Sequence, residues 1–188
     1  LGIEASAEGP FSKKSKASYL FNYRYSTLAL LKGFLDLDGG VVPEYQDLSF
    51  KLDFPSKKAG TFSLFGIGGT NKAERDVEKD NTKWDEDNEN VNYSGKGKLG
   101  VTGLSHQYFL TANSYLKTVL SVTGDRYDLK TDTLNPAENY SRVDVVRTRF
   151  INTAYRASVL YNNKLNTQHL LRAGIIASRL GFDYNSEY

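Results

Sequence analysis

Alternation with a period of two residues is the feature of this sequence that most constrains its fold. The stretch "YQDLSFKLDF", residues 45–54, shows the pattern most clearly. Its apolar positions are Leu48, Phe50, Leu52 and Phe54, and its polar positions are Asp47, Ser49, Lys51 and Asp53. Successive side chains of a strand point to opposite faces of a sheet, so this stretch predicts a strand with one apolar face and one charged face.

The same pattern, rich in aromatic and β-branched residues, recurs along most of the chain. It predicts an all-β protein with about eight strands, paired as four antiparallel hairpins in up-and-down order. The expected strands are residues 2–11, 17–27, 45–54, 61–71, 91–109, 115–129, 142–161 and 168–184. Helical spacing occurs only in residues 26–37, where glycines interrupt it, so we expect a loop there.

The connections between the expected strands alternate in length. The short ones are residues 12–16, 55–60, 110–114 and 162–167, and the long ones are residues 28–44, 72–90 and 130–141. Short turns at one end and long polar loops at the other are typical of transmembrane β-barrels of the bacterial outer membrane. The last two expected strands exceed the about 9–11 residues that a tilted strand needs to cross a bilayer, so we expect their ends to reach into solvent.

Composition agrees with a transmembrane barrel and argues against other classes. Hydrophobic content is 39%, yet aromatic content reaches 13%, as polar loops and aromatic interface residues would produce. The net charge of +2 gives no reason to expect a nucleic-acid partner. The chain has no Cys, which removes disulfides and thiolate sites from consideration. Spanning the membrane with strands needs no long apolar segment.

On this interpretation the alternating residues divide into two sets. The lipid-facing set is Tyr19, Phe21, Tyr23, Leu48, Phe50, Leu52 and Phe54. The lumen-facing set is Arg24, Asp47, Lys51 and Asp53, and Lys117, Arg156 and Arg172 are further candidates for the inner face. Charges that face a lumen either pair across strands or contact a plug or a solute, and the first of these is the commoner arrangement.

Few residues suggest a metal site or catalysis. Asp85, Asp87 and Glu89 alternate as in a calcium-binding loop, but the glycine and the terminal glutamate of such a loop are absent. A solvated loop is the better interpretation, and we expect no cofactor. Ser105 and His106 are adjacent on an expected strand and therefore point to opposite faces, so they cannot act as nucleophile and base. We do not expect an enzyme.

Three stretches resemble a known family. "EGPFSKKSKASYLFNYRYSTL" (residues 8–28), "PEYQDLSFKLDFP" (residues 43–55) and "TFSLFGIGGTN" (residues 61–71) are similar to the barrel of TonB-dependent outer-membrane receptors. The most similar type carries a carboxypeptidase-regulatory-like domain and a plug before the barrel. The resemblance covers most of the chain and is strongest in residues 8–71. These motifs are structural, so they say nothing about the solute.

The resemblance implies uptake of a bound solute across the outer membrane, driven by TonB acting through the plug. The implied partners are outer-membrane lipid, the remaining strands and plug of the same receptor, and a possible surface lipoprotein. Large outer-membrane transporters have about 22 strands around a plugged lumen. Eight strands are too few for that, so we expect residues 1–188 to be a barrel segment without the plug.

Two alternatives remain open from the sequence. A small closed eight-stranded barrel with a structural or adhesive role would pair the first strand with the eighth. A soluble β-sandwich that serves as a binding module would cover the apolar face of its strands with a second sheet.

Overall fold

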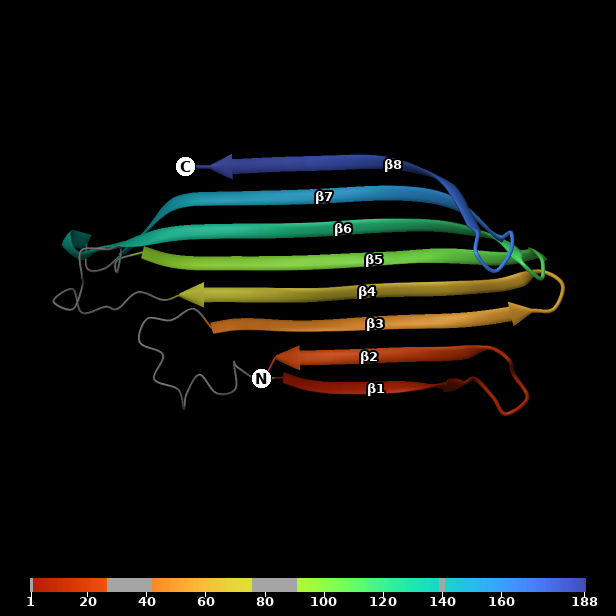
Figure 1. The fold of residues 1–188 in the computed structure, drawn as a ribbon. Coiled ribbons are helices and arrows are strands. Elements are labelled where there is room, and N and C mark those ends of the chain that lie inside the picture. Colours follow the sequence, from red (N-terminus) through yellow and green to blue (C-terminus); the bar gives the residue numbers. More distant parts are fainter. Residues whose placement is uncertain (1, 27–41, 76–90, 139–140) are drawn as a thin grey trace.

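The chain folds into one antiparallel sheet. A computed structural model describes residues 2–26, 42–75, 91–138 and 141–188. Eight strands lie in sequence order, each hydrogen-bonded to the next along the chain (Figure 1). All the ladders are antiparallel, which confirms the predicted all-β class and the up-and-down order.

The strands lengthen toward the C-terminal half. They are β1 (Gly2–Pro10), β2 (Ser18–Ser26), β3 (Val42–Ser56), β4 (Gly60–Arg75), β5 (Val91–Thr111), β6 (Ser114–Asn135), β7 (Ser141–Lys164) and β8 (Leu170–Glu187), with a short 3-10 helix, η2 (Pro136–Glu138), after β6. All eight predicted strands are present, and β7 reaches 24 residues. Strands of this length are far beyond the usual mode of about 5–6 residues in globular proteins.

The short connections are confirmed, but one of the long ones is wrong. Residues 130–141 were expected to form a loop, yet β6 continues to Asn135, which pairs with Ser141 at the start of β7. Polar residues in this stretch belong to a strand because they bond to the neighbouring strands. The expected loops at residues 28–44 and 72–90 lie largely outside the described residues, but residues 42–44 and 72–75 belong to β3 and β4 and not to loops. Of residues 26–37, where a loop was also expected, the structure describes only Ser26, at the end of β2.

The sheet does not close on itself. Strand β1 pairs only with β2 and strand β8 only with β7, and the two lie at opposite edges of the sheet (Figure 1). The closed eight-stranded barrel required a ladder between these two strands, so that alternative is wrong for the described chain. A sandwich required a second sheet, and the described residues form only one.

Cross-strand register assigns every strand residue to one of two faces. Phe50 lies opposite Phe21 on β2 and Gly66 on β4, and we call the surface that these positions share the Phe50 face. Ser49 lies opposite Asn22 and Ile67, and these positions define the Ser49 face. Residues that are directly opposite in an antiparallel ladder point to the same side of the sheet, so the assignment extends through all eight strands.

The sheet has no interior of its own. Within the described part of the chain, Leu134 is the only buried hydrophobic residue. Large apolar side chains instead stand exposed on the sheet, such as Leu104 at 45% and Leu120 at 52% of full exposure. Among the described residues, no helix is long and apolar enough to cross a membrane.

Candidate functional site

A band of uncharged and mostly apolar residues crosses the Phe50 face from β2 to β7. Its residues are Tyr19, Phe21, Tyr23, Leu48, Phe50, Leu52, Phe54, Phe62, Leu64, Gly66, Gly68, Gly100, Thr102, Leu104, His106, Tyr108, Leu116, Thr118, Leu120, Val122, Gly124, Ile151, Thr153, Tyr155, Ala157, Val159 and Tyr161. None of them is Asp, Glu, Lys or Arg. On β5 the band runs from Gly100 to Tyr108 and on β6 from Leu116 to Gly124. Each of these stretches has the length of about 9–11 residues with which a tilted strand crosses a bilayer.

The opposite face carries charge at the same level of the strands. On the Ser49 face, the charged residues over this length are Glu4, Glu8, Arg24, Asp47, Lys51, Asp53, Lys117, Asp125, Arg156 and Arg172. One charge, Arg179 on the edge strand β8, lies on the Phe50 face opposite Tyr155. The sheet therefore separates an apolar side from a polar side through the whole of the band.

The two sets of residues singled out in the sequence lie on opposite faces of the sheet, as their alternation predicts. The seven residues expected to face lipid all lie on the Phe50 face, and the four expected to face a lumen all lie on the Ser49 face. Among the latter, Arg24 Nη2 lies 2.9 Å from Asp47 Oδ2 on the neighbouring strand. Lys51 Nζ lies 2.8 Å from Asp53 Oδ2, and Ser63 donates to the other oxygen of Asp53. These charges therefore pair with one another on the Ser49 face.

Above the band, toward the ends of the strands that carry the longer connections, the Phe50 face becomes strongly charged. We call these residues the charged belt: Glu44, Lys72, Glu74, Lys96, Lys98, Arg126, Asp128, Lys130, Asp132, Asp144, Arg147, Arg149, Asp183 and Glu187. The belt begins two residues beyond the band on β5 and β6, at Lys98 and Arg126. The boundary between uncharged and charged rows is therefore sharp and runs across neighbouring strands.

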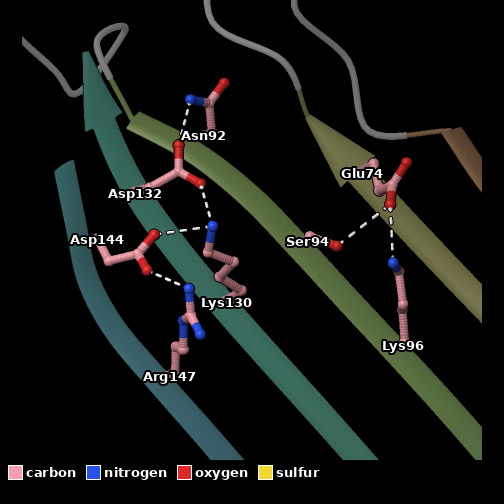
Figure 2. Close-up of polar contacts among 8 residues, drawn as sticks. All are labelled: Glu74, Asn92, Ser94, Lys96, Lys130, Asp132, Asp144 and Arg147. Carbon is pink, nitrogen blue, oxygen red and sulfur yellow. Dashed lines mark hydrogen bonds and ion pairs between the residues drawn. The ribbon is translucent and has the colours of Figure 1, made fainter. Parts of the chain in front are cut away.

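Lys130 is the centre of one ion-pair network in the belt (Figure 2). Its Nζ lies 2.8 Å from Asp144 Oδ1 and 3.2 Å from Asp132 Oδ2. Asn92 Nδ2 donates to the second oxygen of Asp132 at 2.5 Å, and Arg147 pairs with Asp144. The two carboxylates lie directly opposite each other in the β6–β7 ladder, so Lys130 offsets a repulsion that the register imposes. The hydrogen bonds that Lys130 donates to Asp144 and Asp132 raise its pKa.

Two other carboxylates in the belt are each held by cations. Arg126 Nη2 donates to Asp128 Oδ1 at 2.9 Å, and Arg149 Nε donates to the same oxygen at 2.8 Å. The hydrogen bond from Arg126 is the main reason that the pKa of Asp128 falls to about 2, with Arg149 adding to it. Glu74 accepts from Ser94 at 3.2 Å and lies 3.6 Å from Lys96 (Figure 2). A hydrogen bond from Lys72 lowers the pKa of Glu74.

At the level of the belt, the Ser49 face is aromatic. Tyr127, Phe150 and Tyr184 lie in one row across β6, β7 and β8. The rings of Phe150 and Tyr184 have centroids 5.1 Å apart, and the hydroxyl oxygens of Tyr93 and Tyr127 are 2.8 Å apart. That hydrogen bond raises the pKa of Tyr127. At the level of the apolar band the Phe50 face is apolar and the Ser49 face is charged, whereas at the level of the charged belt the Phe50 face is charged and the Ser49 face is aromatic.

The structure brings no metal-binding group together in the described residues, where no cluster of three or more His, Asp or Glu side chains is placed to hold an ion. The calcium candidates Asp85, Asp87 and Glu89 lie outside the described residues. His106 donates through Nε2 to the carbonyl of Ala59 at 2.6 Å and stacks on Phe62, with ring centroids 4.2 Å apart. Its ring therefore ties β5 to the turn between β3 and β4.

The sequence alone did not predict that the Phe50 face divides into an apolar band and a charged belt. The signal lies in every second residue of β5 and β6: Lys96, Lys98 and Gly100 on one, Gly124, Arg126 and Asp128 on the other. Only the register shows that these two boundaries align, with Lys98 directly opposite Arg126. The sequence of a single strand shows the alternation, but it does not show that the boundaries on neighbouring strands lie at the same height.

The fold and its faces together define the class: an all-β, up-and-down antiparallel sheet with one apolar and one polar side. Comparisons with protein-family models, with curated proteins and with solved structures find no significant match.

Proposed function

We propose that this chain is a barrel segment of a TonB-dependent receptor of the bacterial outer membrane, and that the receptor takes up a bound solute. The apolar band of the Phe50 face is the observation that carries the proposal. An exposed apolar surface that extends over several strands needs an apolar partner, because contiguous patches of more than a few hundred Å² are rare on soluble monomers. Lipid is such a partner, and the length of the band along β5 and β6 matches the length with which a tilted strand crosses a bilayer.

The opposite face and the open edges support a large barrel. Paired charges such as Arg24 with Asp47 are stable where a water-filled lumen or a plug meets the Ser49 face. Strands β1 and β8 would each leave a row of backbone donors and acceptors without partners in lipid, which costs several kcal/mol per group. In the proposal, further strands of the same receptor pair with both edges. The stretches in residues 8–71 that resemble TonB-dependent receptors point to the same architecture.

The proposed receptor works with several partners. Its lumen holds a plug, TonB acts on that plug from the periplasm, and a surface lipoprotein is a possible further partner. The aromatic row of Tyr127, Phe150 and Tyr184 lies above the band on the lumen side, where an entering solute would meet the barrel wall. The proposal includes neither a catalytic role nor a cofactor.

The environment of each face can be tested with spin labels. The chain contains no cysteine, so Leu104→Cys and Ser105→Cys each give one reporter within it, on opposite faces of β5. In lipid vesicles, we expect the label at residue 104 to collide mainly with oxygen, which concentrates in lipid. The label at residue 105 should collide mainly with a water-soluble nickel chelate. Equal accessibility of the two labels would refute the membrane assignment.

The receptor part of the proposal needs a separate test. Cross-linking in cells, followed by purification of the full-length protein, should recover TonB together with the barrel. The yield of this cross-link should fall when the cell's energy supply to TonB is removed. Recovery of a properly inserted barrel without TonB would leave an outer-membrane protein but exclude energised uptake.

A further inference from the structure

A row without side chains interrupts the apolar band just below the charged belt. Gly68, Gly100 and Gly124 lie directly opposite one another on β4, β5 and β6, all on the Phe50 face. A Cβ atom at Gly100 or Gly124 would meet nothing within 4 Å, and one at Gly68 would meet only the carbonyl of Leu99 at 3.5 Å. The glycines therefore form the floor of an open hollow in the surface, and no neighbouring side chain occupies the space over Gly100 or Gly124.

The hollow continues in both directions along the strands. Toward the turns, a space of about 390 Å³ is lined by Leu48, Phe50, Thr102 and Val122 together with the three glycines. It adjoins a wider apolar space of about 720 Å³, which Thr102 and Val122 also line. These two spaces form a groove whose length lies within the apolar band. Its walls on the Phe50 face are hydrocarbon apart from the hydroxyls of Thr102 and Tyr155, with Arg179 at its far end.

Toward the belt, the same groove ends at two cations. A space of about 360 Å³ shares Gly100 and Gly124 with the groove and is bordered by Lys98, Arg126 and Ile151. Lys98 and Arg126 lie directly opposite each other in the β5–β6 ladder, an arrangement of like charges that is unfavourable unless an anion lies between them. Within the described chain, Lys98 has no carboxylate within 4 Å, whereas Arg126 bonds to Asp128.

The acidic residues nearby neutralise this end of the groove only in part. Asp128 accepts from Arg126, but the same carboxylate also accepts from Arg149. Asp125 borders it but lies on the Ser49 face, where its carboxylate accepts a hydrogen bond from Asn152 at 2.7 Å. Asp183 shares the row of Lys98 and Arg126 but is separated from them by Ile151 on β7. The groove therefore presents an apolar channel capped by positive charge.

We propose that this groove binds one lipid that carries an anionic, phosphate-bearing headgroup. The acyl chain lies over Gly100 and Gly124 and along Val122, and the phosphate sits between the ammonium of Lys98 and the guanidinium of Arg126. Charge complementarity carries the proposal, because a neutral headgroup would leave Lys98 without a counter-charge, and Arg126 with only a carboxylate that it shares with Arg149, at the end of an apolar channel. The inference rests on the proposed membrane location of the Phe50 face.

Quenching by brominated lipids tests the proposal. The full-length protein carries a single fluorophore at Thr118→Cys, which lies on the same face nearer the turns. It is inserted into two kinds of vesicle. In one, phosphatidylglycerol is brominated and phosphatidylcholine is not, and in the other, phosphatidylcholine is brominated and phosphatidylglycerol is not. We expect phosphatidylglycerol to compete several-fold better than phosphatidylcholine for the site. Lys98→Gln should reduce that preference about fivefold, the effect of one cation near an anionic membrane surface.

Two further variants complete the design. Gly100→Val fills the floor of the groove at a position where an added Cβ meets nothing within 4 Å, and should also abolish the preference while the barrel stays folded. Lys117→Gln removes a cation from the opposite face and should change nothing. The same preference in the parent and in Lys98→Gln, or equal quenching by the two lipids in the parent, refutes the lipid site and leaves the proposed function standing. Absence of quenching by either lipid means that the face does not meet lipid, and both proposals then fail.

Discussion

The ring of Phe50 occupies the space above Gly66, which lies directly opposite it in the β3–β4 ladder. A Cβ atom added at Gly66 would come within 2.5 Å of Phe50 Cε1 and 3.1 Å of the carbonyl of Val101. The aromatic side chain and the glycine are therefore a fitted pair, in which the missing side chain on one strand provides room for the large one on the next. Gly103 stands in the same relation to Phe65 on the Ser49 face, but there the Leu120 carbonyl is also close, at 2.7 Å.

Alanine substitutions at three glycines should therefore differ in cost. Gly103→Ala should destabilise most, by about 2–3 kcal/mol, because a backbone carbonyl cannot move aside as a ring can. Gly66→Ala should cost about 1 kcal/mol, since the Phe50 ring can tilt outward. Gly100→Ala, which meets nothing, should be neutral or slightly stabilising. The free energy of unfolding from vesicles in urea measures all three, and an equal cost at Gly100 and Gly103 would contradict the packing described.

Charge substitutions on neighbouring residues of β3 report which face meets lipid. Phe50→Arg places a guanidinium in the apolar band and should lower the free energy of unfolding by about 2–4 kcal/mol if the residue lies near the bilayer midplane. Ser49→Arg places the same group on the polar face, between Asn22 and Ile67, and should be far milder. Urea titration of both variants in the same vesicles makes the comparison. Equal costs would overturn the assignment of the two faces.

The sequence was sufficient for the strands and their alternation because both are local properties. Each side chain of β3 was assigned to its face from period 2 alone, and the ladders place Phe50 and Ser49 on the two sides accordingly. The assignment of lipid to one side and lumen to the other stays a prediction, because the described chain contains neither. The closed eight-stranded alternative was wrong because an edge can be recognised only when the whole sheet is known.

The upper halves of the long strands could not be predicted from composition. Lys130 and Asp132 were read as loop residues because they are polar, yet they lie in β6 and bond across it to Asn92 and Asp144. Asp144 lies 14 residues from Lys130 and Asn92 lies 40 residues from Asp132, and no local pattern of the sequence predicts either pairing. Similarly, the glycine row at Gly68, Gly100 and Gly124 exists only through the register of three strands.

The stability of the charged belt should depend on pH in the acid range. Asp128 has a pKa of about 2 in the folded protein against an ordinary value of 3.8, because Arg126 and Arg149 hold its carboxylate. A lowered folded pKa means that the ionised form contributes its full stability above the ordinary value, and that this contribution is lost as the pH falls from about 4 toward 2. The shifts of Glu74 and Asp144 have the same direction and add to the loss.

Urea midpoints measured at several pH values between about 2 and 6 test this dependence. The parent should weaken as the pH falls through this window, and Asp128→Asn should weaken less because it has no proton to take up at that position. Because the side chains concerned are partly exposed, the dependence should shrink in high salt. A curve for Asp128→Asn identical to that of the parent would show that this carboxylate does not contribute.

Removing Lys130 should expose the repulsion between the two carboxylates it joins. In Lys130→Ala, Asp132, whose side chain is only 5% exposed, keeps Asn92 but faces Asp144 directly across the ladder. We expect a loss of about 1–3 kcal/mol in the free energy of unfolding, the cost of an unmatched buried polar group. The matched control is Lys98→Ala, because Lys98 has no carboxylate partner in the described chain. This variant should stay within about 0.5 kcal/mol of the parent.

Adding Asp144→Asn to Lys130→Ala should recover part of the loss, and a double-mutant cycle gives the coupling energy between the two residues. If Lys130→Ala and Lys98→Ala lower the free energy of unfolding equally, the Lys130 network does not contribute to stability.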